Sequence, residues 1–146
     1  MAKPKLAKLR FYVDADTLGL AHLLTAVRSD VTYPGDPGGT VDKRKRPACD
    51  IDPATPDHEW IPVVAERGLV VITRDRRISQ RTGEKAAVRD ASGRHISITS
   101  REPLRKFEIL EVVICQWRKI EELASLPGPY IYGITRTSIR KIDDFG

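Results

Sequence analysis

The sequence predicts an α/β fold, a three-layer α/β/α sandwich with a mostly parallel central sheet. Short apolar runs, typical of buried strands, alternate along the chain with segments whose apolar residues recur at helical spacing. The chain has 146 residues, 40% of them hydrophobic, which is enough for one sizeable core. No apolar stretch approaches the ~18 residues of a membrane span, and the two cysteines form no CxxC motif. We therefore expect a cytoplasmic protein without a membrane partner.

The first part of the chain predicts a basic tail, a strand, a helix and a second short strand. Residues 1–8 carry lysines and no acidic residue, and we expect them to form the tail. Residues 9–15 are an apolar run that ends in aspartate, which predicts a buried strand. Residues 17–29 have an apolar stripe at helical spacing, and residues 31–33 are a candidate strand.

A long loop is expected next. Residues 34–56 are rich in proline, glycine and charged residues, and they show no periodicity. Loops of this length within a compact domain are usually functional or disordered. We treat residues 9–146 as a single domain that contains this loop.

Strands and helices continue to alternate in the central part. Residues 55–68 have helical spacing, and residues 69–75 form a second apolar strand that ends in aspartate. Residues 78–92 predict a short helix. Residues 94–100 alternate between polar and apolar side chains, so we expect a strand in which His95 faces outward.

The longest periodic segment covers residues 103–125 and predicts a single helix. Its expected apolar face consists of Phe107, Leu110, Ile114, Trp117 and Ile120. Residues 129–142 then close the chain as one strand or as a bent pair of strands.

Three aspartates are expected at one edge of the sheet. Asp14 and Asp75 end two of the strands, and Asp57 opens the helix that leads into the second of them. Ligands of open α/β sheets bind beyond the carboxyl ends of the strands. Crowded carboxylates raise each other's pKa, and a hard cation such as Mg²⁺ relieves this repulsion. Metal-bound carboxylates beside basic residues suit phosphodiester hydrolysis, although each aspartate taken singly also suits a helix cap or a turn.

Basic residues cluster in two further places. The net charge is +5, and the clusters are either a solvated surface or a footprint for RNA phosphates. The candidate phosphate-binding residues are Lys43, Arg44, Lys45, Arg46, Arg74, Arg76 and Arg77. Phosphate contacts carry no sequence information, so they do not identify a target RNA.

Two stretches resemble a known family. FYVDADTLGLAHLL and TPDHEWIPVVAERGLVVITRD, followed by a basic segment and a helix with Glu84, resemble the PIN domain, and more narrowly its VapC-type toxins. The similarity covers roughly residues 9 to 91. The resemblance implies a PIN-like fold and a metal-dependent endoribonuclease, a hydrolase that forms the toxin half of a toxin–antitoxin pair.

The resemblance also implies a site and partners. Asp14, Asp57 and Asp75 match the family's catalytic acids, which bind Mg²⁺ or Mn²⁺. A further family acid, from a helix after the first strand, has no counterpart here, and Glu84, Glu59 or Asp16 are the candidate substitutes, with Glu84 as the auxiliary ligand. The implied partners are an RNA substrate, a small cognate antitoxin and a second copy of the chain.

Two alternatives remain open from the residues alone. The segment VDADTLG also matches the opening of haloacid-dehalogenase-like phosphatases, in which Asp14 is the nucleophile and Asp16 the general acid/base. In that interpretation Lys85 is the family's lysine, and Asp143 with Asp144 is the late acidic pair. The other alternative is a catalytically inactive PIN-like module that binds RNA or a partner.

Overall fold

The computed structural model describes residues 3–74, 82–100 and 102–146, which form a sandwich of helices around a sheet. The described strands of this sheet follow the order β3-β2-β6-β7-β8-β9. Neighbouring strands are parallel, except that β9 runs antiparallel to β8. The strands are β2 (Phe11–Val13), β3 (Val31–Thr32), β6 (Val70–Thr73), β7 (Arg94–Ile98), β8 (Tyr130–Ile134) and β9 (Ile139–Asp143).

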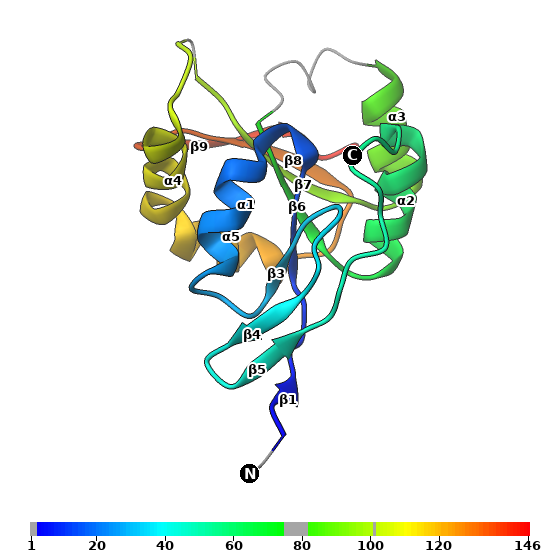
Figure 1. Ribbon diagram of the computed structural model, residues 1–146. Coiled ribbons are helices and arrows are strands. Elements are labelled where there is room, and N and C mark those ends of the chain that lie inside the picture. Colours follow the sequence, from blue (N-terminus) through cyan, green and yellow to red (C-terminus); the bar gives the residue numbers. More distant parts are fainter. Residues whose placement is uncertain (1–2, 75–81, 101) are drawn as a thin grey trace.

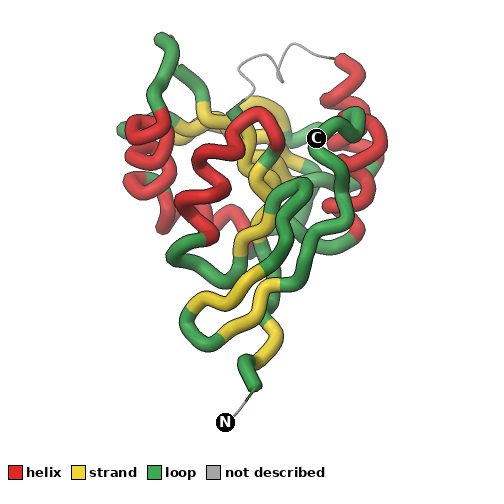
Figure 2. Tube along the Cα trace, viewed as in Figure 1, coloured by secondary structure: helices red, strands yellow, loops and turns green. Residues whose placement is uncertain are grey.

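Helices cover both faces of the sheet (Figures 1 and 2). The helices on one face are α1 (Leu18–Thr25), α4 (Lys106–Cys115) and α5 (Trp117–Ala124). The helices on the other face are α2 (Asp57–Glu66) and α3 (Thr82–Asp90). This arrangement confirms the predicted α/β/α sandwich.

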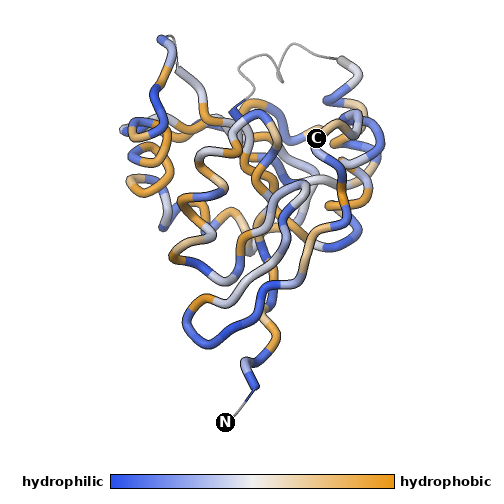
Figure 3. The backbone as a smooth tube through the Cα atoms, in the orientation of Figure 1, coloured by the Kyte–Doolittle hydropathy of each residue, from blue (hydrophilic) through white to orange (hydrophobic). Residues whose placement is uncertain are grey.

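The central strands are apolar on both faces, as expected of a parallel sheet between two helical layers. In β2, Phe11 and Val13 face the α1 side, whereas Tyr12 faces α2. In β6, Val71 also faces α2, and all four residues of the strand are buried. Figure 3 shows apolar stretches in the central strands and in α1 and α4.

The segment predicted as a long loop contains a hairpin. Strands β4 (Gly39–Val41) and β5 (Arg44–Arg46) pair antiparallel, and β1 (Lys5–Leu6), within the predicted tail, pairs parallel to β5. The turn between them places Asp42 and Lys43 at φ of 50° and 64°, as tight hairpin turns require. These polar strands pair through their backbones, which explains why no hydrophobic periodicity predicted them.

The predicted helix over residues 103–125 is two helices, and the prediction of one was wrong. Helix α4 ends at Cys115 and α5 begins at Trp117, with Gln116 between them at φ of −101° and ψ of 6°. The buried Gln116 amide donates a 2.9 Å hydrogen bond to the carbonyl oxygen of Thr135. As a result, Ile120 is buried whereas Phe107 and Ile114, expected on the same apolar face, are exposed.

The end of the chain forms the bent pair of strands, because β8 and β9 turn back on each other at Thr135 and Ser138. Within the described residues, every helix is too short or too polar to span a bilayer.

Candidate active site

Asp14 lies at the carboxyl end of β2, directly before the short 3-10 helix η1 (Ala15–Thr17). Its backbone N–H donates to the Ile72 carbonyl oxygen of β6 at 3.0 Å, which continues the pairing of the two strands. Its carboxylate caps η1, since the Ala15 N–H donates to Asp14 Oδ1 at 2.6 Å. Asp14 therefore caps a helix and also belongs to the candidate site. The cap occupies Oδ1, whereas Oδ2 lies near the Thr73 hydroxyl of the neighbouring strand.

Asp57 is the first residue of α2, and this end of the helix lies at the same edge of the sheet as Asp14. The indole N–H of Trp60 donates to Asp57 Oδ1 at 2.9 Å. Trp60 is itself buried and stacks on Tyr12 with ring centroids 5.2 Å apart. A rigid aromatic side chain thus holds the Asp57 carboxylate in place.

A hydroxyl and a third carboxylate complete this edge. The Thr73 hydroxyl, at the end of β6, lies 2.7 Å from Asp16 Oδ2 and 3.3 Å from Asp14 Oδ2. The backbone N–H of Arg74 also donates to Asp16, at 3.2 Å. Asp16 is exposed and Asp14 is half-buried, so Asp16 forms the outer wall of the cluster.

The structure brings several of the predicted residues together. One small cavity is lined by Asp14, Asp57, Trp60, Ile61, Thr73, Glu84 and His95. Burial, followed by the nearby carboxylates of Asp16 and Asp57, raises the pKa of Asp14 to about 7. Glu84 reaches the cavity from the first turn of α3. The remaining predicted ligand, Asp75, lies outside the described residues.

The donors at this cavity fit a hard divalent cation. Among the described residues, no three His, Cys, Asp or Glu side chains are grouped closely enough to hold one metal ion. Magnesium, however, is commonly bound through one or two carboxylates together with waters and substrate phosphates. Asp14 and Asp57 supply such oxygens, and a cation would offset both the burial and the neighbouring negative charges that raise the pKa of Asp14.

The described members of the predicted phosphate-binding set do not form one surface. Arg74 lies at the site edge, with its guanidinium bonded to the Leu104 carbonyl oxygen at 3.0 Å. Arg76 and Arg77 lie outside the described residues. The remaining four are in or beside the β4–β5 hairpin, which lies at the lower end of Figure 1, whereas α1, which follows β2, begins at the upper end.

Arg46 is buried, so the prediction that it binds RNA phosphates was wrong. Its side chain is 5% exposed and forms an ion pair with Asp36, whose side chain is fully buried. It also donates to the Val31 carbonyl oxygen at 3.3 Å. Since its charge is already satisfied inside the protein, Arg46 holds the hairpin to the sheet, while Lys43, Arg44 and Lys45 remain exposed.

Four residues of the cavity were not predicted as site residues: Trp60, Ile61, Thr73 and His95. His95 was expected to face outward, and this was wrong, because its exposed fraction is 1%. Strand β7 lies between β6 and β8 with helices on both sides, so its polar face is covered as well as its apolar face. Both faces of a parallel sheet are covered, so the predicted parallel sheet itself indicated that His95 lies in the interior.

The geometry argues against the phosphatase alternative. Asp143 lies on β9, four strands away from Asp14 on β2, and each strand spacing is about 4.8 Å. Asp143 also lies 3.5 Å from Lys85, so the supposed lysine and late acid pair with each other. Asp143 therefore lies about 19 Å across the sheet from Asp14, too far to act on the same phosphate.

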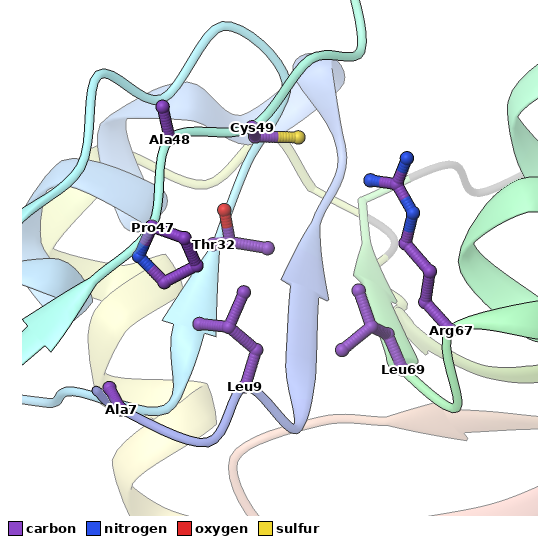
Figure 4. Close-up of a pocket in the computed structure, with 8 residues that line it drawn as sticks. All are labelled: Ala7, Leu9, Thr32, Pro47, Ala48, Cys49, Arg67 and Leu69. Carbon is purple, nitrogen blue, oxygen red and sulfur yellow. The ribbon is translucent and has the colours of Figure 1, made fainter.

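A larger cavity, of about 340 Å³, lies at the other end of the sheet (Figure 4). Leu9 and Leu69, which precede β2 and β6, point into it together with the Cys49 thiol, and Arg67 stands at its side. Its lining, as far as the structure describes it, contains no carboxylate. We therefore place the candidate active site at the smaller cavity, where the acidic side chains meet.

Comparison with protein families gives a result that agrees with this geometry. The family described as "PIN like domain" matches residues 9–100, which is more than half of the chain and includes the cavity carboxylates Asp14, Asp57 and Glu84. A search of curated proteins and a search of solved structures each return no match. The chain belongs to the PIN-like domain family.

Proposed function

We propose that this protein is a divalent-cation-dependent endoribonuclease of the VapC type, the toxin component of a toxin–antitoxin pair. The family to which it belongs consists generally of nucleases, which commonly use divalent metals. The observation that carries the proposal is the meeting of Asp14 and Asp57 at one cavity on the carboxyl edge of the sheet, with the pKa of Asp14 raised to about 7.

The proposed roles follow from the chemistry of each residue. Asp14 and Asp57, together with Asp75, would hold Mg²⁺ or Mn²⁺, with Glu84 as an auxiliary ligand. When bound, such a cation lowers the pKa of the attacking water and neutralises charge on the scissile phosphate. Thr73 orients the Asp14 and Asp16 carboxylates through its hydroxyl.

RNA binding is proposed to use two groups of cations. Arg74, with Arg76 and Arg77, would contact phosphates beside the cleaved bond. Lys43, Arg44 and Lys45 are exposed on the β4–β5 hairpin, at the opposite end of the sheet, and would contact a more distant part of the same RNA. Such contacts orient the backbone and do not select a sequence.

The proposed protein partners are a small antitoxin and a second copy of the chain. An antitoxin that covers the acidic edge would inhibit by excluding RNA from Asp14 and Asp57. A basic side chain is the chemistry suited to that edge, because it would neutralise the crowded carboxylates.

The test is cleavage of a labelled structured RNA in Mg²⁺, stopped by EDTA. Asp57→Asn keeps the oxygen that accepts from Trp60 but removes the charge, so we expect the variant to fold and to lose cleavage by on the order of 100-fold or more. Asp50→Asn is the matched control, because Asp50 is an exposed aspartate that pairs with Arg67 at 2.8 Å. It should cleave like the wild type.

Two results would contradict the proposal. Hydrolysis of a small phosphate monoester, lost in Asp16→Asn and without RNA cleavage, would favour the phosphatase alternative. RNA binding without cleavage at any Mg²⁺ or Mn²⁺ concentration would favour the inactive module.

A further inference from the structure

His95 is a buried histidine beside the candidate active site. It lies on β7 with an exposed fraction of 1%, and neither ring nitrogen has a partner among the described residues. Buried polar side-chain atoms in native proteins nearly always have a partner, in the protein or in an ordered water. The two unpartnered nitrogens therefore need an explanation.

The ring of His95 lies against the candidate active site. It stacks on Trp60 with centroids 6.0 Å apart and an interplanar angle of 14°, and the same indole donates to Asp57. A methyl group added at Gly93, two residues earlier on the same face, would meet His95 Cδ2 at 3.5 Å. The ring also lines the small cavity together with Asp14, Asp57 and Glu84.

The space in front of His95 matches one small molecule. The cavity that His95 lines with Asp14, Asp57 and Glu84 has a volume of about 10 Å³. A polar cavity of about this size holds one water when it offers two to four hydrogen-bonding groups. The carboxylates and the imidazole provide such groups.

The imidazole can serve as either a donor or an acceptor here. Burial lowers the pKa of His95 to about 4, against an opposing effect of Asp57 that raises it. The ring is therefore neutral at pH 7, with one N–H donor and one acceptor nitrogen.

We propose that the cavity binds a single water molecule that links a ring nitrogen of His95 to the Asp14 and Asp57 carboxylates, which makes His95 a positioning residue of the site. The inference deepens the proposed function, since the carboxylates it orients are those proposed to bind the cation. Groups that hydrogen-bond to metal ligands fix their orientation, and their loss typically weakens metal affinity 10- to 100-fold. His95 acts through the water and does not contact substrate.

Two measurements test this proposal, and the first does not depend on activity. A high-resolution crystal structure of the metal-free wild type should show one water within hydrogen-bonding distance of His95 and of Asp14 or Asp57. A dry cavity would overturn the proposal. So would a Mn²⁺-soaked crystal in which the ion binds directly to a His95 nitrogen.

The second measurement is Mn²⁺ affinity by calorimetry. His95→Phe keeps a flat ring against Trp60 but removes both nitrogens, so we expect the affinity to fall about tenfold. His95→Gln, which restores a polar side chain, should recover part of the loss. His22→Phe is the matched control, because His22 is exposed on α1 and contacts Tyr33 edge-on at 5.2 Å.

The outcomes separate this inference from the proposed function. Wild-type Mn²⁺ affinity in folded His95→Phe would overturn the role of His95, even if the wild type cleaves RNA. If the wild type contains the water and binds Mn²⁺ more tightly than His95→Phe does, but cleaves no RNA, the role of His95 stands and the nuclease proposal fails. Should His95→Phe not fold, His95→Gln and the water in the wild-type crystal decide.

Discussion

At the carboxyl end of β2, Asp14 is half-buried and lies near two further aspartates, so the metal-free protein bears an electrostatic cost at this residue. Burial and the neighbouring charges raise the pKa of Asp14 to about 7, whereas in the unfolded chain it is about 3.9. The folded state therefore binds a proton at Asp14 more tightly than the unfolded state does. Between pH 4 and 7, this makes the free energy of unfolding fall as the pH rises.

Asp14→Asn should remove this dependence. In EDTA, we expect the free energy of unfolding of the variant to exceed that of the wild type by an amount that grows from pH 4 to pH 7 and reaches on the order of 2 kcal/mol after allowance for solvent screening. Urea titrations across this range measure it. Asp90→Asn, at an exposed aspartate with 70% side-chain exposure, should follow the wild-type curve. Curves for Asp14→Asn and the wild type that run parallel would contradict the assignment.

At the scale of the elements, the β4–β5 hairpin depends on a buried ion pair. Asp36 accepts from the Thr32 hydroxyl at 3.0 Å and from the Gly38 N–H at 2.8 Å, and it pairs with Arg46. Removing one partner of such a pair leaves a charge buried without compensation, which is far more costly than losing a surface pair.

Arg46→Met should therefore destabilise the protein by about 3–5 kcal/mol. The neighbouring Arg44→Met removes an equivalent charge from an exposed position and should change the free energy of unfolding by less than about 0.5 kcal/mol. Equilibrium urea unfolding of both variants makes the comparison. Equal, small effects would mean that Arg46 is not the residue that anchors the hairpin.

The same elements show what the sequence can and cannot predict. Apolar runs predicted the strands around Phe11 and Val71, because hydrophobic burial is visible in residue type. The hairpin was missed because its strands pair through the backbone. The break at Gln116 was missed because helical periodicity continues across it.

The site was predicted in part for a related reason. The end of an apolar strand and the start of a helix can both be recognised in a sequence, so Asp14 and Asp57 were expected at one edge of the sheet. In a strand whose residues alternate between polar and apolar, the neighbouring strands and helices decide whether the polar face is covered. The residues of the strand alone do not show this, so His95 was expected at the surface although it lies in the interior.

At the scale of the whole molecule, the parallel sheet separates the two described groups of functional candidates. The carboxylates lie at the carboxyl ends of the strands, and the exposed hairpin cations lie at the other end (Figure 1). If the hairpin binds RNA phosphates, its cations contribute to affinity and not to the chemical step.

Replacement of Lys43, Arg44 and Lys45 by glutamine should make the salt dependence of RNA binding less steep. Each lost phosphate contact reduces the slope of log K against log salt concentration by about 0.7 for single-stranded RNA. The cleavage rate at saturating RNA should remain that of the wild type. Fluorescence anisotropy at several salt concentrations measures the slope, and an unchanged slope would exclude the hairpin from the RNA interface.

The most direct test of the central claim is the position of a divalent cation in a crystal soaked with Mn²⁺. Our account predicts an anomalous-scattering peak between the carboxylates of Asp14 and Asp57, lost in a soaked Asp57→Asn crystal. A peak that lies elsewhere, or none at a Mn²⁺ concentration that supports RNA cleavage, would contradict it.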